Sequence, residues 1–208
     1  REFHSLDLEV TPAVLIPRPE TETLVECALE RLPPGRPLAV ADLGTGSGAI
    51  ALAIASERPL ARVLAVDASP DALAVASRNA ERLGIANVAF AHGDWYGALP
   101  PDAGPFDLIA ANPPYVASGD EHLDQGDLRF EPPHALVAGG DGLDALRTIV
   151  SGAPSHLVPG GWLVVEHGYD QSEAVRALFG QAGFEAIEAR RDLAGIPRIV
   201  AGRRPPGG

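Results

Sequence analysis

Short apolar runs alternate with stretches of helical periodicity along this chain, and no other feature restricts its fold as strongly. Five runs have the length of buried strands, at 38–43, 61–67, 87–94, 106–111 and 161–167. Helical spacing before or after them predicts helices at 20–32, 47–57, 70–83, 142–157 and 172–182. Two more strands, at 184–191 and 196–202, are predicted to pair as a hairpin. Strands joined through helices form right-handed crossovers, so we predict an α/β fold with a seven-stranded, mostly parallel sheet and a C-terminal antiparallel hairpin.

The same pattern divides the chain. We predict a β-hairpin and linker at 1–18, one domain at 19–203 and a disordered tail at 204–208, where no periodicity remains. The 208 residues are enough for one globular domain with a core. No apolar run approaches the roughly 18 residues that span a bilayer, and no basic-then-apolar leader opens the sequence, so we expect a cytoplasmic protein without membrane contact. The single cysteine, Cys27, is expected to be buried on a helix.

The formal net charge of −12 bears on the partners. Contacts with phosphate need clustered Lys and Arg, so direct binding to nucleic acid is not expected. Two interpretations of the acidity stay open: it favours a basic partner or substrate, or it only keeps the protein soluble. We expect a monomer.

The segment "DLGTGSGAIALA" (42–53) indicates a cofactor site. Gly44, Gly46 and Gly48 follow a strand and open a helix, so the backbone can turn tightly and approach a ligand closely. Asp67 ends the next strand, where a carboxylate can accept both hydroxyl groups of a ribose. The alternative is a glycine turn that only permits the helix to pack on the strand. The order strand, turn, helix, strand and acid favours a nucleoside cofactor.

Residues near this turn bear on which nucleoside is bound. Gly44, Gly46 and Ala49 also fit the dinucleotide fingerprint G-x-G-x-x-G/A. Asp42 would repel a pyrophosphate but suits a ligand with an ammonium and a sulfonium group, as in S-adenosylmethionine. "GDW" (93–95) ends the third strand and supplies Asp94 to accept from an adenine amino group and Trp95 to cover the ring, although Trp95 alone could be an aromatic residue at the core edge.

"NPPY" (112–115) follows the fourth strand and is predicted to hold the substrate. The side chain of Asn112 and the carbonyl group of Pro113 offer two acceptors, and Pro114 stiffens the loop that carries them. Two fixed acceptors suit a planar NH₂ group, on which Tyr115 could stack. Such a grip aims the nitrogen lone pair at a methyl donor, so catalysis is mainly orientation. The alternative is an ordinary proline-rich loop.

The remaining candidates are weak. His122, His134 and His156 are interpreted as surface or loop residues, and His167, beside Glu166, as a supporting residue near the pocket. No Cys/His cluster indicates zinc, so no metal is expected.

Six motifs together resemble one family. They are "LIPRPETETLVE" (15–26), "DLGTGSGAIALA", "GDW", "NPPY", "RFEPPHALVAGGDGL" (129–143) and "EHG" (166–168). Over residues 3–202 the chain resembles the PrmC/HemK family of protein N5-glutamine methyltransferases, which modify the Gly-Gly-Gln loop of class I peptide-chain release factors. The resemblance implies a Rossmann-like class I methyltransferase that uses S-adenosylmethionine, releases S-adenosylhomocysteine and needs no metal.

The resemblance also implies roles for the motif residues. The methionine part of the cofactor would lie on Gly44, Thr45, Gly46 and Gly48. Asp67 would take the ribose, Asp94 and Trp95 the adenine, and Arg18 and Thr21 would line the cofactor's edge beside Asn112. Asn112, Pro113, Pro114 and Tyr115 would hold the substrate glutamine.

Two departures and three alternatives accompany the resemblance. The family's N-terminal helical bundle is not in this sequence, which bears on docking, and His4 replaces a usual aromatic residue. The first alternative is the sibling enzyme that methylates a glutamine of a ribosomal protein. A DNA adenine methyltransferase also shares "NPPY", but the net charge of −12 speaks against it. A non-catalytic protein that binds the cofactor is the third.

Overall fold

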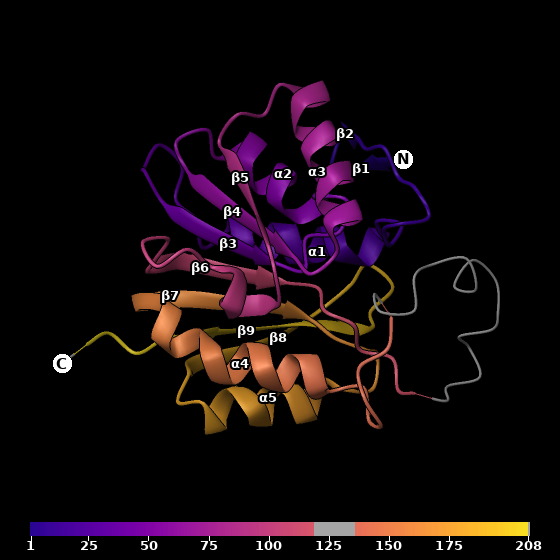
Figure 1. The fold of residues 1–208 in the computed structure, drawn as a ribbon. Helices are drawn as coiled ribbons and strands as arrows, with labels where there is room; N and C mark the ends of the chain where they lie inside the picture. Colours follow the sequence, from indigo (N-terminus) through magenta and orange to yellow (C-terminus); the bar gives the residue numbers. More distant parts are fainter. Residues whose placement is uncertain (119–135, 208) are drawn as a thin grey trace.

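The computed structural model describes residues 1–118 and 136–207. A seven-stranded sheet runs through the molecule in the order β5-β4-β3-β6-β7-β9-β8 (Figure 1). Its strands are β3 (Ala39–Leu43), β4 (Arg62–Asp67), β5 (Val88–His92), β6 (Phe106–Ala111), β7 (Leu157–Glu166), β8 (Glu185–Arg191) and β9 (Pro197–Arg203). The first five are parallel, and β9 pairs antiparallel with both β7 and β8. The α/β class, the strand number and the C-terminal hairpin are as predicted.

Helices from the described part of the chain cover both faces of the sheet (Figure 1). The helices α1 (Pro19–Leu29), α2 (Ala49–Glu57) and α3 (Pro70–Leu83) lie on one face, and α4 (Asp144–His156) and α5 (Ser172–Gln181) on the other. Alternate residues of β3 point to opposite faces, so Val40 packs in the core on the first side and Ala41 in the core on the second. Ser69 caps α3 by accepting from Ala72 N at 3.2 Å.

The structure differs from the predicted elements in a few places. The fourth helix starts at Asp144, because Gly142 has a φ of +76° that a helix does not allow. β7 starts at Leu157, before the predicted 161, and a β-bulge opposite β6 absorbs the extra residues. Trp95–Ala98 forms a short 3-10 helix, η1. Arg204, assigned to the tail, continues the pairing through its N–H to Gly161 O at 2.7 Å.

The first residues form a small hairpin that packs on the domain. Its strands are β1 (Glu2–Phe3) and β2 (Leu6–Asp7). Phe3 and Leu8 are buried in the same core as α1 and α2, and so is Cys27, as expected.

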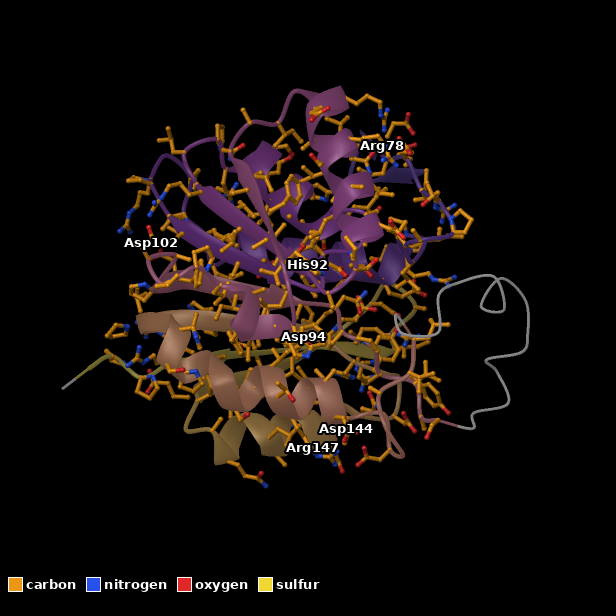
Figure 2. The ribbon with its side chains drawn as sticks, in the orientation of Figure 1. Arg78, His92, Asp94, Asp102, Asp144 and Arg147 are labelled. Atoms are coloured by element: carbon orange, nitrogen blue, oxygen red, sulfur yellow. The ribbon has the colours of Figure 1, made fainter. Side chains whose placement is uncertain are left out.

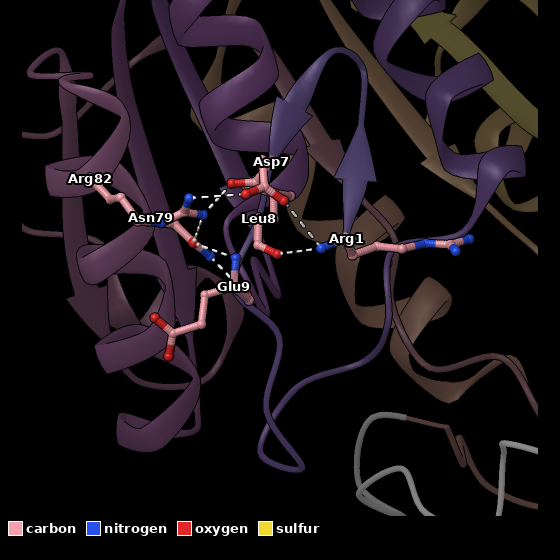
Figure 3. A network of polar contacts seen from close by, with 6 residues as sticks. All are labelled: Arg1, Asp7, Leu8, Glu9, Asn79 and Arg82. Atoms are coloured by element: carbon pink, nitrogen blue, oxygen red, sulfur yellow. Dashed lines mark hydrogen bonds and ion pairs between the residues drawn. The ribbon is translucent and has the colours of Figure 1, made fainter.

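A polar network fastens the chain after this hairpin to α3 (Figure 3). Glu9 N donates to Asn79 Oδ1 at 2.7 Å, and Asn79 Nδ2 donates to Glu9 O at 3.0 Å. Arg82 donates to the backbone carbonyl group of Asp7 and to Asn79 Oδ1. The segment that follows, residues 10–18, is thereby held beside the carboxyl ends of the strands.

The strand order places a crevice where a ligand can bind. From β3 the chain continues to β4 and β5 on one side and to β6 and β7 on the other. In open α/β sheets, ligands bind outside the carboxyl ends of the strands at this reversal. None of the described helices is long and apolar enough to cross a membrane. The described residues also contain no group of three or more His, Cys, Asp or Glu side chains placed to hold a metal ion.

Candidate active site

The glycine turn after β3 depends on backbone angles that favour glycine. Gly44, Gly46 and Gly48 have φ values of +77°, +55° and +86°. The N–H groups of Gly44 and Thr45 both donate to Val66 O, at 2.8 and 2.9 Å, which ties the turn to the end of β4. A Cβ on Gly48 would lie 3.2 Å from Cβ of Ala76, so this glycine also lets α2 approach α3. The turn is therefore preorganised by its neighbours.

Asp42 lies underneath the turn. Its Oδ2 accepts from the Thr45 hydroxyl at 2.6 Å and from Ala51 N at 3.2 Å, while its buried Oδ1 has no partner among the described residues. Burial raises the pKa of Asp42 to about 7. We expected this carboxylate beside the ligand, but its side chain braces the turn and the start of α2 and does not line the cavity described below.

Asp67 ends β4 and faces the turn. Its Oδ2 accepts from Gly46 N at 2.8 Å and its Oδ1 from Ser69 N at 2.9 Å. A carboxylate has about four lone-pair sites, so both oxygens can still accept a further hydrogen bond. The two backbone bonds fix the direction in which those sites point.

Asp94 and Trp95 follow β5 from the other side of the turn. The Trp95 ring lies so close to the turn that a Cβ on Gly44 would be 3.1 Å from its Cζ3 atom. Trp95 also packs against the core on the α4 side, so it is both a core-edge residue and a wall of the cavity. In Figure 2, Asp94 lies near the middle of the molecule between the two helical layers, whereas Asp144 and Arg147 lie on the outer layer formed by α4.

A cavity of about 260 Å³ opens at this point. It is lined by nine of the residues predicted for the cofactor, namely Arg18, Thr21, Gly44, Thr45, Gly46, Asp67, Asp94, Trp95 and Asn112. Gly48 is not in the wall, because it sits at the N-cap of α2. The sequence reasoning missed Ala13, Val14 and Leu15, which close one side. Their signal was the apolar "AVLIP" run before the "PRPE" motif.

A second cavity, of about 290 Å³, adjoins the first. Pro113 and Tyr115 line it, together with Glu166 and Arg198, which the sequence reasoning did not assign to a site. Of these two, only Glu166 carried a signal, since "EHG" (166–168) was among the family motifs. The walls common to the two cavities are formed by Leu15, Arg18, Asn112 and Pro114. The "NPPY" loop therefore stands between a cavity with the cofactor motifs and a second cavity of its own.

Asn112 is at this boundary and has one free acceptor. Its Nδ2 donates to Thr21 Oγ1 at 3.2 Å, and its buried Oδ1 has no partner among the described residues. Thr21 Oγ1 in turn donates to Glu166 Oε2 at 2.7 Å, and the Tyr115 hydroxyl donates to Glu166 Oε1 at 3.3 Å. Burial raises the pKa of Glu166 to about 7 and raises that of Tyr115 as well. A buried acceptor without a partner is costly, so it marks a place where a donor belongs.

The histidines do not enter either cavity wall among the described residues. His167 is buried after Glu166 and its Nδ1 bonds to Gly168 O at 2.7 Å. His156 is not a free surface residue, because it ends α4 and stacks on Tyr96 with 4.3 Å between ring centroids. His122 and His134 lie outside the described residues, as does part of the 129–143 motif.

Comparison with known proteins fits this geometry. Residues 36–186 match the family model of a methyltransferase domain. A release factor glutamine methyltransferase of Xylella fastidiosa is 59% identical over 205 residues, which are 99% of this chain and 74% of that protein. The one of Escherichia coli K12 is 50% identical over 203 residues, 98% of this chain and 72% of that protein.

A solved structure gives the same result. The release factor-specific protein-(glutamine-N5) methyltransferase of Alicyclobacillus acidocaldarius is 32% identical, with a TM-score of 0.54, and the match covers 96% of this chain and 100% of that one. The fold, the glycine turn and the "NPPY" loop occur together here, and relatives of 50–59% identity match nearly the whole chain. This chain belongs to the release factor glutamine methyltransferase family.

Proposed function

We propose that this chain transfers a methyl group from S-adenosylmethionine to the side-chain amide nitrogen of the glutamine in the Gly-Gly-Gln motif of class I peptide-chain release factors. The observation that carries the proposal is the buried, unpartnered Oδ1 of Asn112 between the two cavities. The names of the relatives, which are 50–59% identical, support the release factor as the protein substrate.

The first cavity fits a nucleoside cofactor. Asp67 has acceptor sites left for ribose hydroxyl groups, and Asp94 with Trp95 offers an acceptor and a flat ring for the adenine. The glycine turn leaves backbone uncovered by side chains beside them. Bound S-adenosylmethionine supplies an electrophilic methyl group and leaves as S-adenosylhomocysteine.

The second cavity fits the glutamine side chain. An amide nitrogen is a poor nucleophile, because its lone pair is shared with the carbonyl group. Asn112 Oδ1 and the Pro113 carbonyl group each accept a hydrogen bond from the NH₂ group of the substrate amide. These two bonds orient the nitrogen lone pair and stabilise the polarised amide. The nitrogen gains the methyl carbon and then releases one proton, so a strong base is not needed beforehand. Tyr115 packs beside the amide plane, with its hydroxyl held by Glu166.

The test is mass spectrometry of a purified class I release factor after incubation with this chain and the cofactor. We expect one added methyl group on the glutamine of its Gly-Gly-Gln loop. A ribosomal-protein substrate and duplex DNA are run in parallel, and cofactor binding is measured by calorimetry. Methylation of either rival substrate in place of the release factor, with cofactor bound, would overturn the proposal.

A further inference from the structure

We propose that Thr21 and Glu166 act as positioning residues that fix which end of the Asn112 side-chain amide faces the substrate. The inference rests on the proposed function of Asn112. Three side chains are involved: Thr21 on α1, Glu166 at the end of β7 and Asn112 in the "NPPY" loop. We call the hydrogen bonds that join them, given above, the relay.

The series of hydrogen bonds begins at Glu166, which must accept a hydrogen bond from each of its two neighbours to satisfy both. Its side chain is 1% exposed, and its two oxygens each face a hydroxyl group, from Thr21 at 2.7 Å and from Tyr115 at 3.3 Å. Above its pKa of about 7, Glu166 is a carboxylate, which accepts and does not donate. The charges that act on Glu166 come from Arg198 on β9, which favours the ionised form, and from Glu20 on α1, which opposes it.

Thr21 links Glu166 to Asn112 and determines which group of the Asn112 amide faces it. A hydroxyl group has one hydrogen, and Thr21 directs it to Glu166, so its oxygen is left as an acceptor for Asn112. The group of Asn112 that faces Thr21 at 3.2 Å must then be the NH₂ donor. The Oδ1 atom is consequently turned to the opposite side, where it is buried at the cavity boundary.

The alternative orientation would be unproductive. If Thr21 had no fixed acceptor, its hydrogen could go to Asn112 Oδ1 and the amide could rotate by half a turn. Asn112 would then present NH₂ to the NH₂ of a substrate amide, and one of the two acceptors would be lost. The three residues are far apart in sequence, with a separation of 145 from Thr21 to Glu166, so only the fold brings them together.

The test uses Thr21→Val, which keeps the shape of the side chain and removes its hydroxyl. At saturating cofactor and release factor we expect kcat to fall by about tenfold or more, in line with losing a contact that orients a transition-state group. Thr21→Ser, which restores the hydroxyl, recovers most of that loss. Thr23→Val is the matched control, because Thr23 is also buried on α1 but lines neither cavity, and we expect wild-type kcat.

Non-additivity separates positioning from a general structural effect. In an Asn112→Ala background, Thr21→Val should change kcat by less than about twofold, since residues that act as one unit are not additive. Glu166→Leu also releases the Tyr115 hydroxyl, so it should cost at least as much as Thr21→Val, and the two together should cost no more than Glu166→Leu alone. Unfolding temperatures and cofactor affinities are measured for all variants to check that each one is folded. Full additivity, or wild-type kcat in Thr21→Val, would overturn the proposal.

A second readout does not need turnover. In a ¹⁵N–¹H spectrum, the side-chain NH₂ signals that disappear in Asn112→Asp identify Asn112. They should shift in Thr21→Val and in Glu166→Leu but stay in place in Thr23→Val. Asn112 NH₂ signals that do not shift in Thr21→Val and Glu166→Leu would contradict the relay even if the release factor is methylated. If wild-type protein methylates no release factor, the proposed function fails, while these signals still decide the relay.

Discussion

At the scale of single residues, the proposed site contains buried polar atoms that have no partner among the described residues. Asn112 Oδ1 is the clearest case, since it is buried and faces the boundary between the cavities. Its amide is held from behind by Thr21 at 3.2 Å. We therefore expect this oxygen to interact with the substrate and not to stabilise the folded state.

Asn112→Ala tests that view directly. We expect kcat to fall by on the order of a hundredfold or more, as for the loss of an oriented transition-state acceptor. Cofactor affinity should change little, because the glycine turn, Asp67 and Asp94 remain. Turnover is measured by mass spectrometry of the release factor, and affinity by calorimetry. Unchanged turnover would remove Asn112 from the mechanism.

Gly44 is a second residue on which the shape of the site depends, because it lies against the Trp95 ring. Gly44→Ala would put a Cβ 3.1 Å from the Trp95 ring in a backbone conformation with φ +77°. We expect the free energy of unfolding to fall by about 1–3 kcal/mol and cofactor affinity to fall at least tenfold, because either Trp95 or the turn must move. Gly35→Ala, at φ +74° with open space around it, is the control for the backbone term alone. Equal cofactor affinity in the two variants would contradict the role of the Trp95 contact.

At the scale of elements, the proposed cofactor cavity depends on a segment without secondary structure. Residues 13–15 and 17–18 form part of its wall, although no strand or helix contains them. Asn79 of α3 anchors the chain just before this segment. It bonds to both backbone groups of Glu9, and its Nδ2 donates to Ser47 O of the glycine turn at 3.0 Å.

Asn79→Ala should therefore have two effects. It leaves buried backbone groups unsatisfied, so we expect a loss of about 2–3 kcal/mol in the free energy of unfolding. It also loosens one wall of the cavity, so cofactor affinity should fall severalfold. Denaturant unfolding and calorimetry measure the two. Arg78→Ala is the matched control, since the pair of Arg78 Nη2 with Glu9 Oε1 at 2.8 Å is exposed to solvent and should contribute little to stability. If both variants bind cofactor like the wild type, the anchor is not needed.

At the scale of the whole molecule, two buried carboxyl groups link folding to pH. Asp42 and Glu166 both have a pKa raised by burial to about 7. The folded state thus holds these protons more tightly than the unfolded state. The stability that they contribute is fully present below their unfolded pKa values and is lost as pH rises through about 7.

Asp42→Asn isolates one of these groups. Asparagine keeps an acceptor for Thr45 and cannot ionise, so this part of the pH dependence should vanish. Relative to wild type, the variant should gain on the order of 1 kcal/mol in the free energy of unfolding per pH unit between about pH 5 and about pH 7. Denaturant unfolding over this pH range provides the measurement. A difference that does not change with pH would show that Asp42 is ionised throughout.

The sequence allowed most of the architecture to be predicted, for a physical reason. Strands buried on both faces are continuous apolar runs, and glycine turns and proline loops mark their carboxyl ends. Those ends share one edge of the sheet, so Asp67, Asp94 and Asn112 could be placed together before their contacts were known. The family resemblance added Arg18 and Thr21.

Other features depend on contacts that sequence spacing does not encode. Glu166 meets Thr21 only because the end of β7 lies beside α1. Asp42 was predicted beside the ligand because it stands two residues before the first glycine of the turn. The direction of its side chain, however, is set by its hydrogen bonds with Thr45 and Ala51. The early start of β7 was missed because Gly160 and Gly161 look like a break, whereas the strand passes through them.

The shared wall between the two cavities also has a pharmacological meaning. Among the described residues, Leu15, Arg18, Asn112 and Pro114 are common to both linings, so a single molecule that passes this shared wall could fill both cavities. An adenosine analogue tethered to a glutamine mimic loses its translational and rotational freedom once, whereas two separate ligands lose theirs twice. With donor and acceptor bound as proposed, we therefore expect bisubstrate inhibitors to bind this protein more tightly than either half does alone.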